Sequence, residues 1–444
     1  MTALHVARPM TSPERPTWGG ALWVGAIDID DLARSGVDDV VLDDCDGYRA
    51  ARLLVRRGRD VLGFIEVPVV AGHVPADLVR AETLTLPTPV AAADSLVLPA
   101  VTVVLCTRDR AEQLRGALTS VLALDYPAFD VIVVDNAAAT SDTRDLVAAE
   151  FDDERVRLVS EPKPGLSSAR NTGLLAATGE IVAFTDDDVV VDREWLRGIV
   201  SGFAHGADVV CVSGLVPSGE IRTAVQSYFD DRVSWSKNVT TRVFRLADRP
   251  DDLPLFPFSV GAFGTGANFA LRRDDVIALG GFDTAFGVGT RTGGGEDLDI
   301  FTRVLFAGHA LVVEPSAVVW HRHRSDLAAL RTQATGYGTG LGAWLTKIAL
   351  DPGTLALALR RAPRALRHLF AKDDGDIPSV IASEAAGQPR VDWAGEVARV
   401  GRHERMSVLR GPLLYLRQRW DGAGLIPAGR RPARRAVEPV GGRR

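Results

Sequence analysis

Cysteine is scarce in this chain, and long apolar runs are missing. Its 444 residues include only three cysteines, Cys45, Cys106 and Cys211, which are too few and too scattered for a disulfide framework or a zinc site. This scarcity indicates a reducing compartment. No run approaches the ~18–20 apolar residues that cross a bilayer, and residues 1–9 lack the apolar stretch of a signal peptide. We therefore expect a soluble cytoplasmic protein that is at most peripheral on the inner face of a membrane.

Strong net charge and several well-known catalytic motifs are also missing. The formal net charge is −6, which gives no reason to expect a nucleic-acid partner. The loop after the first strand of the central region has no G-x-G-x-x-G, so a dinucleotide fold of the NAD type is not expected. The absence of G-x-x-x-x-G-K-[ST] excludes P-loop NTPases, and neither G-x-S-x-G nor H-E-x-x-H occurs.

What the chain does have is an apolar content of 46%, enough for a large core and more than one domain. A hairpin is predicted at Tyr48–Arg56 and Asp60–Val67, before a Pro- and Ala-rich linker at 86–99. The predicted regions are a small N-terminal α+β accessory domain with its linker (1–98), a central α/β domain (99–325), and a helical C-terminal region (326–444) whose basic tail (430–444) is expected to be disordered.

Strand and helix patterns alternate in the central region. The strand-like runs are Val101–Cys106, Asp130–Val134, Arg155–Val159 and Glu180–Thr185, and the helical runs are Arg110–Leu122, Asp142–Phe151 and Leu166–Ala177. This order predicts a Rossmann-like, mostly parallel sheet covered by helices on both faces. Ligands of such sheets bind beyond the carboxyl ends of the strands, so the residues that follow each strand are the candidates for a site.

Polar residues follow three of these strands, at Thr107–Arg110, at Asp135 and Asn136, and at Asp186–Asp188. The last group is the most informative, because three adjacent carboxylates at the end of a buried strand repel one another unless a cation holds them. Hard oxygen ligands suit Mg²⁺ or Mn²⁺. The alternative is an acidic turn that caps the helix after Val191. The neighbouring motifs favour the metal site.

Eight motifs occur in a fixed order along the central region. They are Val101–Arg110, Asp125–Asn136, Gly165–Gly173, Phe184–Asp188, Gly264–Leu271, Gly280–Asp283, Gly293–Asp299 and Trp320–His323. This series resembles family 2 glycosyltransferases, the inverting, nucleotide-sugar-dependent enzymes of the GT-A fold. The resemblance covers about residues 100–325 and leaves the two terminal regions unexplained.

For the donor, the resemblance implies that Thr107 and Arg108 touch the nucleotide base and that Asp135 hydrogen-bonds the base or ribose. Arg170 is implied near the diphosphate or ribose, and its alternative is a helix-surface arginine in a salt bridge. The family often has a second Asp followed by Gly-Ser where this chain has Asn136 and three alanines. The base preference therefore stays open.

For the metal, the resemblance implies Asp188 as a direct ligand and His321 as a further one. Asp186 is the ribose-side member of the triplet and another candidate ligand, and Asp187 lies between the two. His323 could replace His321 or pair with phosphate. A neutral imidazole would complete a mixed oxygen and nitrogen site for the divalent cation.

The candidate general base is Asp297, with Glu296 beside it to orient it or to bind the acceptor. Both follow the flexible lead Gly293–Gly295 into a predicted helix, where the macrodipole favours an ionised carboxylate. They differ by ~100° around a helix axis, so we expect one of them to face the acceptor. The alternative is that both are first-turn helix stabilisers.

The sequence thus predicts an inverting, metal-dependent glycosyltransferase that moves a sugar from a nucleotide diphosphate donor to a hydroxyl acceptor, which is a glycan, a lipid-linked molecule or a small molecule. One alternative is a nucleotide-sugar-binding scaffold without turnover. Another is a sugar-1-phosphate nucleotidyltransferase, which would carry a Gly-x-Gly-Thr-Arg loop after the first strand. The basic amphipathic segment 353–370 predicts peripheral contact with an anionic membrane, or else a helix packed on the catalytic domain.

Overall fold

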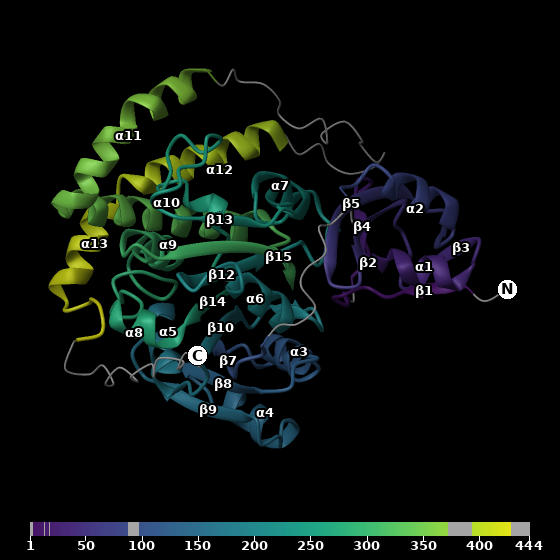
Figure 1. Cartoon of the computed structure of the whole chain (residues 1–444), viewed down its shortest axis with the longest axis horizontal. Helices are drawn as coiled ribbons and strands as arrows, with labels where there is room; N and C mark the ends of the chain where they lie inside the picture. Colours follow the sequence, from purple (N-terminus) through teal and green to yellow (C-terminus); the bar gives the residue numbers. More distant parts are fainter. Residues whose placement is uncertain (1–2, 13, 17, 88–96, 372–392, 428–444) are drawn as a thin grey trace, which may run out of the picture.

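The computed structural model describes residues 3–12, 14–16, 18–87, 97–371 and 393–427. A small N-terminal α/β region lies beside a large central sheet, and C-terminal helices cover one side of that sheet (Figure 1). Most of the predicted linker and the whole predicted basic tail lie outside the described residues.

The N-terminal region contains two small sheets. One is formed by β1 (Leu4–Val6), β3 (Asp39–Leu42) and β6 (His73–Pro75), the other by β2 (Leu22–Asp28), β4 (Ala50–Arg57) and β5 (Asp60–Pro68), with helices α1 (Ile29–Ser35) and α2 (Ala76–Thr83). The antiparallel pair β4–β5 is the predicted hairpin. Its turn includes Gly58 with φ +56, a conformation that glycine adopts without strain. Trp23, Leu53 and Ile65 belong to a core of this region's own.

The central sheet is mixed. Its strands are β7 (Val101–Thr107), β8 (Phe129–Asn136), β9 (Val156–Glu161), β10 (Ile181–Asp186), β11 (Val189–Val191), β12 (Val209–Leu215), β13 (Arg242–Phe244), β14 (Asn268–Arg272) and β15 (Ala310–His321). Their order is β11-β15-β12-β14-β10-β7-β8-β9, with β13 paired to β15. Strands β10, β7, β8 and β9 are parallel, as predicted.

The other half of the sheet corrects the expectation of a mostly parallel arrangement. Strand β14 runs antiparallel to both β10 and β12, and β11 and β13 run antiparallel to β15. Parallel neighbours need a long crossover connection, usually a helix. Strand β14 instead follows an irregular connection and the short 3-10 helix η1 (Val260–Phe263), so it can enter the sheet in the opposite direction.

Helices cover both faces of the sheet, as predicted. One core contains residues of α3 (Ala111–Leu122), α4 (Asp142–Glu150) and α6 (Trp195–Phe203), and the other contains residues of α5 (Leu166–Ala176), α8 (Arg273–Ala278) and α9 (Glu296–Phe306); α7 (Ala224–Arg232) lies next to the N-terminal region. The strands serve both cores because successive side chains alternate between faces. Val103 and Leu105 belong to the first core and Val104 to the second.

The predicted helical C-terminal region consists of α10 (Leu327–Leu350), α11 (Pro352–Ala371), α12 (Trp393–Val408) and α13 (Gly411–Trp420). The glycines of α10 suit close packing rather than an isolated helix. A Cβ at Gly338 would lie 2.3 Å from the carbonyl oxygen of Glu404 on α12, and one at Gly340 would lie 2.7 Å from the backbone of Gly294. Among the described residues, no helix is both long and apolar enough to cross a bilayer.

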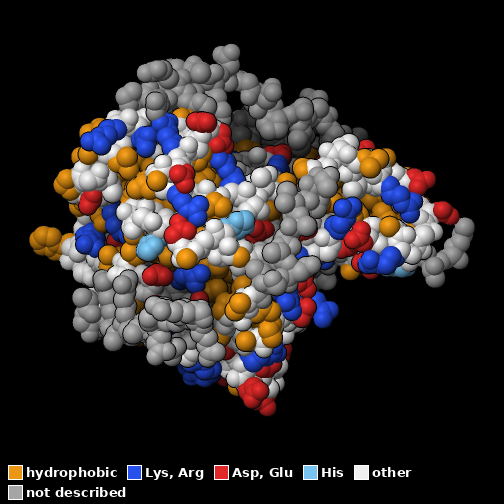
Figure 2. Space-filling view, in the orientation of Figure 1, with side chains coloured by type: hydrophobic (Ala, Val, Ile, Leu, Met, Phe, Trp, Pro, Cys, Tyr) orange, Lys and Arg blue, Asp and Glu red, His pale blue; other side chains and the backbone are white. Residues whose placement is uncertain are grey.

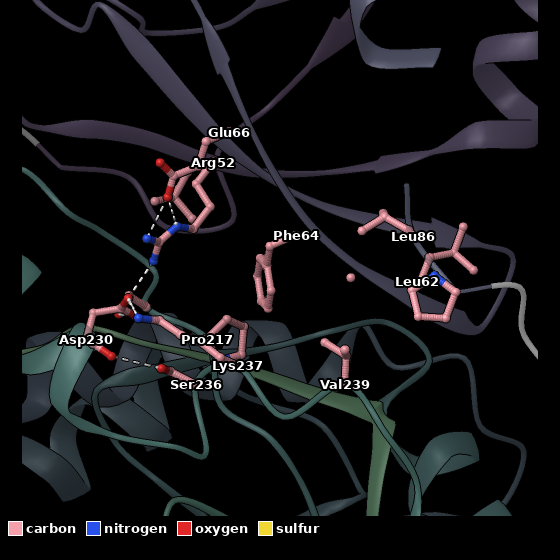
Figure 3. A pocket seen from close by; sticks show the side chains of 14 residues that line it. Arg52, Leu62, Phe64, Glu66, Leu86, Pro217, Asp230, Ser236, Lys237 and Val239 are labelled. Carbon is pink, nitrogen blue, oxygen red and sulfur yellow. Dashed lines mark hydrogen bonds and ion pairs between the residues drawn. The ribbon is translucent and has the colours of Figure 1, made fainter. Parts of the chain in front are cut away.

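The N-terminal region packs on the end of the sheet that carries β15. Val24 and Leu54 meet Val318 and Trp320 in one apolar cluster. Two ion pairs join the same regions, from Arg52 to Asp230 (2.5 Å) and from Arg56 to Asp192 (2.7 Å). A cavity of about 500 Å³ lies between the two regions. Figure 3 shows Phe64 pointing into it from β5, with the ion-paired residues on one side.

Candidate active site

Three strand ends meet at one edge of the parallel half of the sheet. Strand β7 ends at Thr107, β8 at Asn136 and β10 at Asp186. The register aligns Asp186 with Cys106 and Thr107 with Asp135. The polar residues that the sequence analysis singled out after each strand therefore lie at the same edge, as expected for parallel neighbours.

The carboxylate triplet lies beside a histidine from a distant part of the chain. Asp187 and Asp188 form the turn into β11, whose pairing with β15 aligns Val189 with His321. His321 Nε2 is 3.2 Å from Asp188 Oδ1. One ligand atom each from Asp186, Asp188 and His321 lie within 4.8 Å of one another. Two carboxylates and an imidazole are a donor set that fits Mn²⁺ or another hard or borderline divalent cation.

Arg110 offsets the negative charge of the triplet. Its Nη1 is 2.6 Å from Asp187 Oδ1, and its Nη2 is 2.8 Å from Asp188 Oδ2. Arg110 lies in a loop that the strand pattern predicts to be part of a site, but the sequence alone predicts no role for this residue. Arg110 and Asp187 are 77 residues apart in the sequence, so their contact cannot be seen in any local pattern. The parallel pairing of β7 with β10 brings the two loops together.

The first-strand loop splits into a buried and an exposed part. Thr107 is buried, and its hydroxyl donates to Asp187 Oδ2 at 2.7 Å. Burial raises the pKa of Asp187 to about 6, against the opposing effect of Arg110. The Thr107 hydroxyl is thus hydrogen-bonded to the triplet, whereas the Arg108 side chain is half exposed. On β8, Asp135 is buried and its Oδ1 has no hydrogen-bond partner.

Arg170 lies inside the protein rather than on a helix surface, so the surface alternative is wrong. Its side chain is 2% exposed and lies over the rings of Phe269 and Phe282. Its guanidinium is 3.5 Å from Asp186 Oδ1 and 3.2 Å from Glu296 Oε1. A cation between two carboxylates lowers the cost of burying all three groups. Arg170 therefore links the triplet to the start of α9.

Glu296 and Asp297 point to different surroundings, as their angular separation predicts. Glu296 is buried against Arg170, and burial, reinforced by the charge of Asp297, raises the pKa of Glu296 to about 7. Asp297 is partly exposed. Its Oδ1 accepts from the Leu298 N–H at 2.8 Å, and its Oδ2 accepts from the Gly266 N–H at 3.1 Å. Only the Asp297 carboxylate is thus both oriented and open.

The glycine lead to α9 packs against helix α10. Gly293 and Gly295 have φ values of +69 and +90, which favour glycine. A Cβ on Gly295 would lie 2.9 Å from the Gly340 carbonyl oxygen, and one on Gly336 would lie 2.8 Å from that of Gly293. Helix α10 therefore supports the loop that leads into α9, the helix that carries Asp297. The repeated glycines of α10 were the sequence signal for this contact.

His321, not His323, faces the carboxylates. The two Nδ1 atoms are 3.1 Å apart, and His323 packs against the Phe229 ring with 4.6 Å between ring centroids. Burial lowers the pKa of His323 to about 3, and His321 acts in the same direction. A neutral His323 can accept a hydrogen bond at Nδ1 from the Nδ1–H of His321, which leaves His321 Nε2 directed at Asp188. It thus lies behind the candidate ligand, where it fixes the direction of the imidazole.

Comparisons with known proteins place this architecture in a family. Residues 102–280 match the model of glycosyl transferase family 2. The succinoglycan biosynthesis protein ExoM of Rhizobium meliloti is 31% identical over 237 residues, which cover 51% of this chain and 69% of ExoM. The chain belongs to glycosyltransferase family 2, and its α/β architecture is the GT-A fold.

Two further proteins are similar to this chain. A pre-mycofactocin glycosyltransferase of Mycobacterium tuberculosis is 30% identical over 286 residues, which are 64% of this chain and 51% of that protein. The chain thus spans about half the length of this relative. The mannosyltransferase PcManGT of Pyrobaculum calidifontis, solved with GDP-Man and Mn²⁺, is 22% identical with a TM-score of 0.44, covering 76% of this chain and 92% of that one.

Proposed function

We propose that the protein is an inverting, metal-dependent glycosyltransferase that moves a sugar from a nucleoside diphosphate sugar to a hydroxyl acceptor. Family membership supports the reaction class. The observation that carries the proposal is the link between two acidic groups, the triplet Asp186–Asp188 and the pair Glu296 and Asp297. Arg170 joins Asp186 to Glu296, and Gly266 contacts both Arg170 and Asp297.

On the donor side, Asp186, Asp188 and His321 would hold a divalent cation. A bound Mn²⁺ or Mg²⁺ would act as a Lewis acid that stabilises charge on the departing diphosphate. Arg110 and Arg324 lie 2.8 and 3.9 Å from Asp188 and add positive charge to the same place. The free Oδ1 of Asp135 can accept a hydrogen bond from the base or ribose, because a buried acceptor gains most from a partner.

On the acceptor side, Asp297 would take the proton of the attacking hydroxyl. Two backbone N–H groups hold its carboxylate in place, so little ordering remains when the acceptor binds. Glu296 turns inward to Arg170, which leaves one carboxylate to face the acceptor. A single base supports direct displacement at the anomeric carbon, and direct displacement inverts its configuration.

Titration with UDP-, GDP- and dTDP-sugars, with and without Mn²⁺, tests the donor half of the proposal. We expect one nucleotide to bind tightly and only with the metal. An assay of donor hydrolysis then separates an enzyme from a nucleotide-sugar-binding scaffold, because a scaffold binds without releasing nucleotide. Metal-independent binding, or binding with no turnover on any acceptor, would contradict the proposal.

The anomeric configuration of the product tests the inverting mechanism. Nuclear magnetic resonance of the product should show the anomeric configuration opposite to that of the donor, and retention would overturn the direct displacement. Membership of glycosyltransferase family 2 argues against the alternative of a sugar-1-phosphate nucleotidyltransferase. The cysteines Cys45, Cys106 and Cys211 are free thiols, which supports the proposed cytoplasmic location.

A further inference from the structure

An exposed apolar stripe runs along the last helices. It consists of Met406, Leu409, Leu413, Leu416 and Trp420, here called the C-terminal stripe, which are 64, 72, 54, 50 and 92% exposed. Three of its members are spaced by three and four residues on α13, so they share one face of that helix. A tryptophan as exposed as Trp420 buries almost none of its apolar ring within the chain.

The stripe is not an unfinished part of the core, because α13 already packs by its other face. Tyr415 is buried and stacks on Phe286 with 5.3 Å between ring centroids. A Cβ at Gly411 would lie 2.4 Å from the backbone nitrogen of Ala343 on α10. Helix α13 therefore has two apolar faces, and the described part of the chain packs against only one of them. Large apolar side chains left exposed together on one helix face mark an interaction site.

Positive charge surrounds the stripe. Residues 401–420 contain one acidic residue, Glu404, which pairs with Arg232. The same segment contains five arginines, all exposed: Arg402, Arg405, Arg410, Arg417 and Arg419. Asp421 follows directly and pairs with Arg291, and residues 430–444 of the sequence add six arginines and one glutamate. The chain as a whole has a net charge of −6, so this concentration of arginine is local.

Figures 1 and 2 show where this surface lies. Apolar and basic side chains gather together on the left side of the molecule in Figure 2, where Figure 1 places α10, α11 and α13. The α11 segment, which the sequence analysis selected for membrane contact, has a weaker apolar face in its described side chains. Leu359 is 63% exposed, whereas Leu355 and Leu357 are partly buried.

We propose that the C-terminal stripe binds the surface of an anionic lipid bilayer, with α13 lying in the plane of the interface. The apolar side chains would enter the boundary between head groups and acyl chains, and the arginines would contact lipid phosphates. Charge complementarity favours a bilayer, because residues 401–420 contain five exposed arginines and a single acidic residue that is already paired, which together suit a surface of lipid phosphates. This binding is independent of the proposed catalytic activity.

The contacts of α13 connect this surface to the candidate active site. Through Gly411 it packs on α10, and α10 packs through Gly340 on the loop before Asp297. A bilayer at the stripe would therefore lie behind the helix layer that supports the candidate base. This arrangement would hold the enzyme near a lipid-linked acceptor without any membrane-spanning helix.

Flotation of the full chain with lipid vesicles tests the proposal. We expect binding to vesicles of phosphatidylglycerol and phosphatidylcholine, weak binding to phosphatidylcholine alone, and weaker binding at high salt. The variant L413S/L416S/W420S should lose about tenfold or more of the partition constant, because each change removes buried apolar surface. The variant R405E/R410E should lose binding to the anionic vesicles while its apolar side chains remain.

The matched controls are Val70→Ser and Leu84→Ser, which remove exposed apolar side chains (73 and 87% exposed) from the N-terminal region. Both should bind vesicles like the unchanged protein. Circular dichroism and donor titration should show that all variants are folded. Equal flotation of the triple variant and the unchanged protein would overturn the proposal. So would a dimer that dissociates in the triple variant while neither protein floats, since the stripe would then be a self-association surface.

Discussion

The two acidic groups of the site lie on one edge of the sheet but are positioned by different forces. Opposite charges hold the triplet: Arg110 and His321 pair with Asp187 and Asp188. Arg170 pairs with Asp186. Backbone packing holds the loop before Asp297, through the contact of Gly295 with Gly340. A bound metal cation can replace the positive charge that now faces the carboxylates. Nothing bound from solution can replace the backbone of α10 that the loop packs against. The first group is therefore suited to binding a metal, and the second to holding one geometry.

This difference predicts which measurement each substitution will change. Removing a charge near the triplet should alter metal and donor binding first. Disturbing the packed loop should alter turnover first, because a small displacement of a catalytic group is costly even when the substrate still binds. Substitutions in each group test this division.

Asp297→Asn should cut turnover by ~10²–10⁴ and leave donor binding nearly unchanged, because the amide keeps the shape of the side chain but cannot take a proton. Steady-state rates and a donor titration with Mn²⁺ measure the two effects. Glu296→Gln serves as the neighbour control and should retain more activity, since Glu296 faces Arg170. Turnover like that of the unchanged protein would remove Asp297 from its proposed role.

Asp188→Ala should abolish metal-dependent donor binding, and removal of the metal with a chelator should have the same effect on the unchanged protein. The variant loses the carboxylate that His321 and Arg110 both contact. Calorimetry with and without Mn²⁺ is the measurement, and Asp152→Ala, an exposed carboxylate, is the control. An unchanged dependence on metal would mean that the cation binds elsewhere.

Gly340→Ala should lower turnover by about 10² while metal-dependent donor binding persists, because the new Cβ would lie 2.7 Å from the backbone of Gly294 and push the loop before Asp297. Gly401→Ala is the matched control, since a Cβ there meets nothing within 4 Å. If Gly340→Ala weakens donor binding as much as turnover, the two acidic groups are not positioned independently.

His323→Phe should weaken Mn²⁺ binding by ~10–100-fold, because the ring can still pack on Phe229 but no longer contacts His321 Nδ1. Electron paramagnetic resonance of free Mn²⁺ measures this affinity without any donor. His73→Phe, an exposed histidine of the N-terminal region, should have no effect. Mn²⁺ affinity unchanged in His323→Phe would show that His321 is oriented by other contacts.

Local patterns in the sequence were sufficient for the parallel half of the sheet. Strands β7 to β10 and helices α3 to α5 occur close to the predicted positions, because alternation and helical spacing are properties of neighbouring residues. The edge at which Asp135 and Asp186–Asp188 meet followed from the same patterns. The direction of β14 did not, since nothing in a strand's own residues records which way it enters a sheet.

By itself, the sequence determined the family, the core elements and the residue types that gather at the strand ends. Only the tertiary structure decided how they are held: Arg170 is buried between two carboxylates, Arg110 pairs with the triplet, and Gly340 supports the loop before Asp297. Each of these contacts joins segments far apart in the chain. Its energy depends on distance and burial, which exist only after the elements have packed.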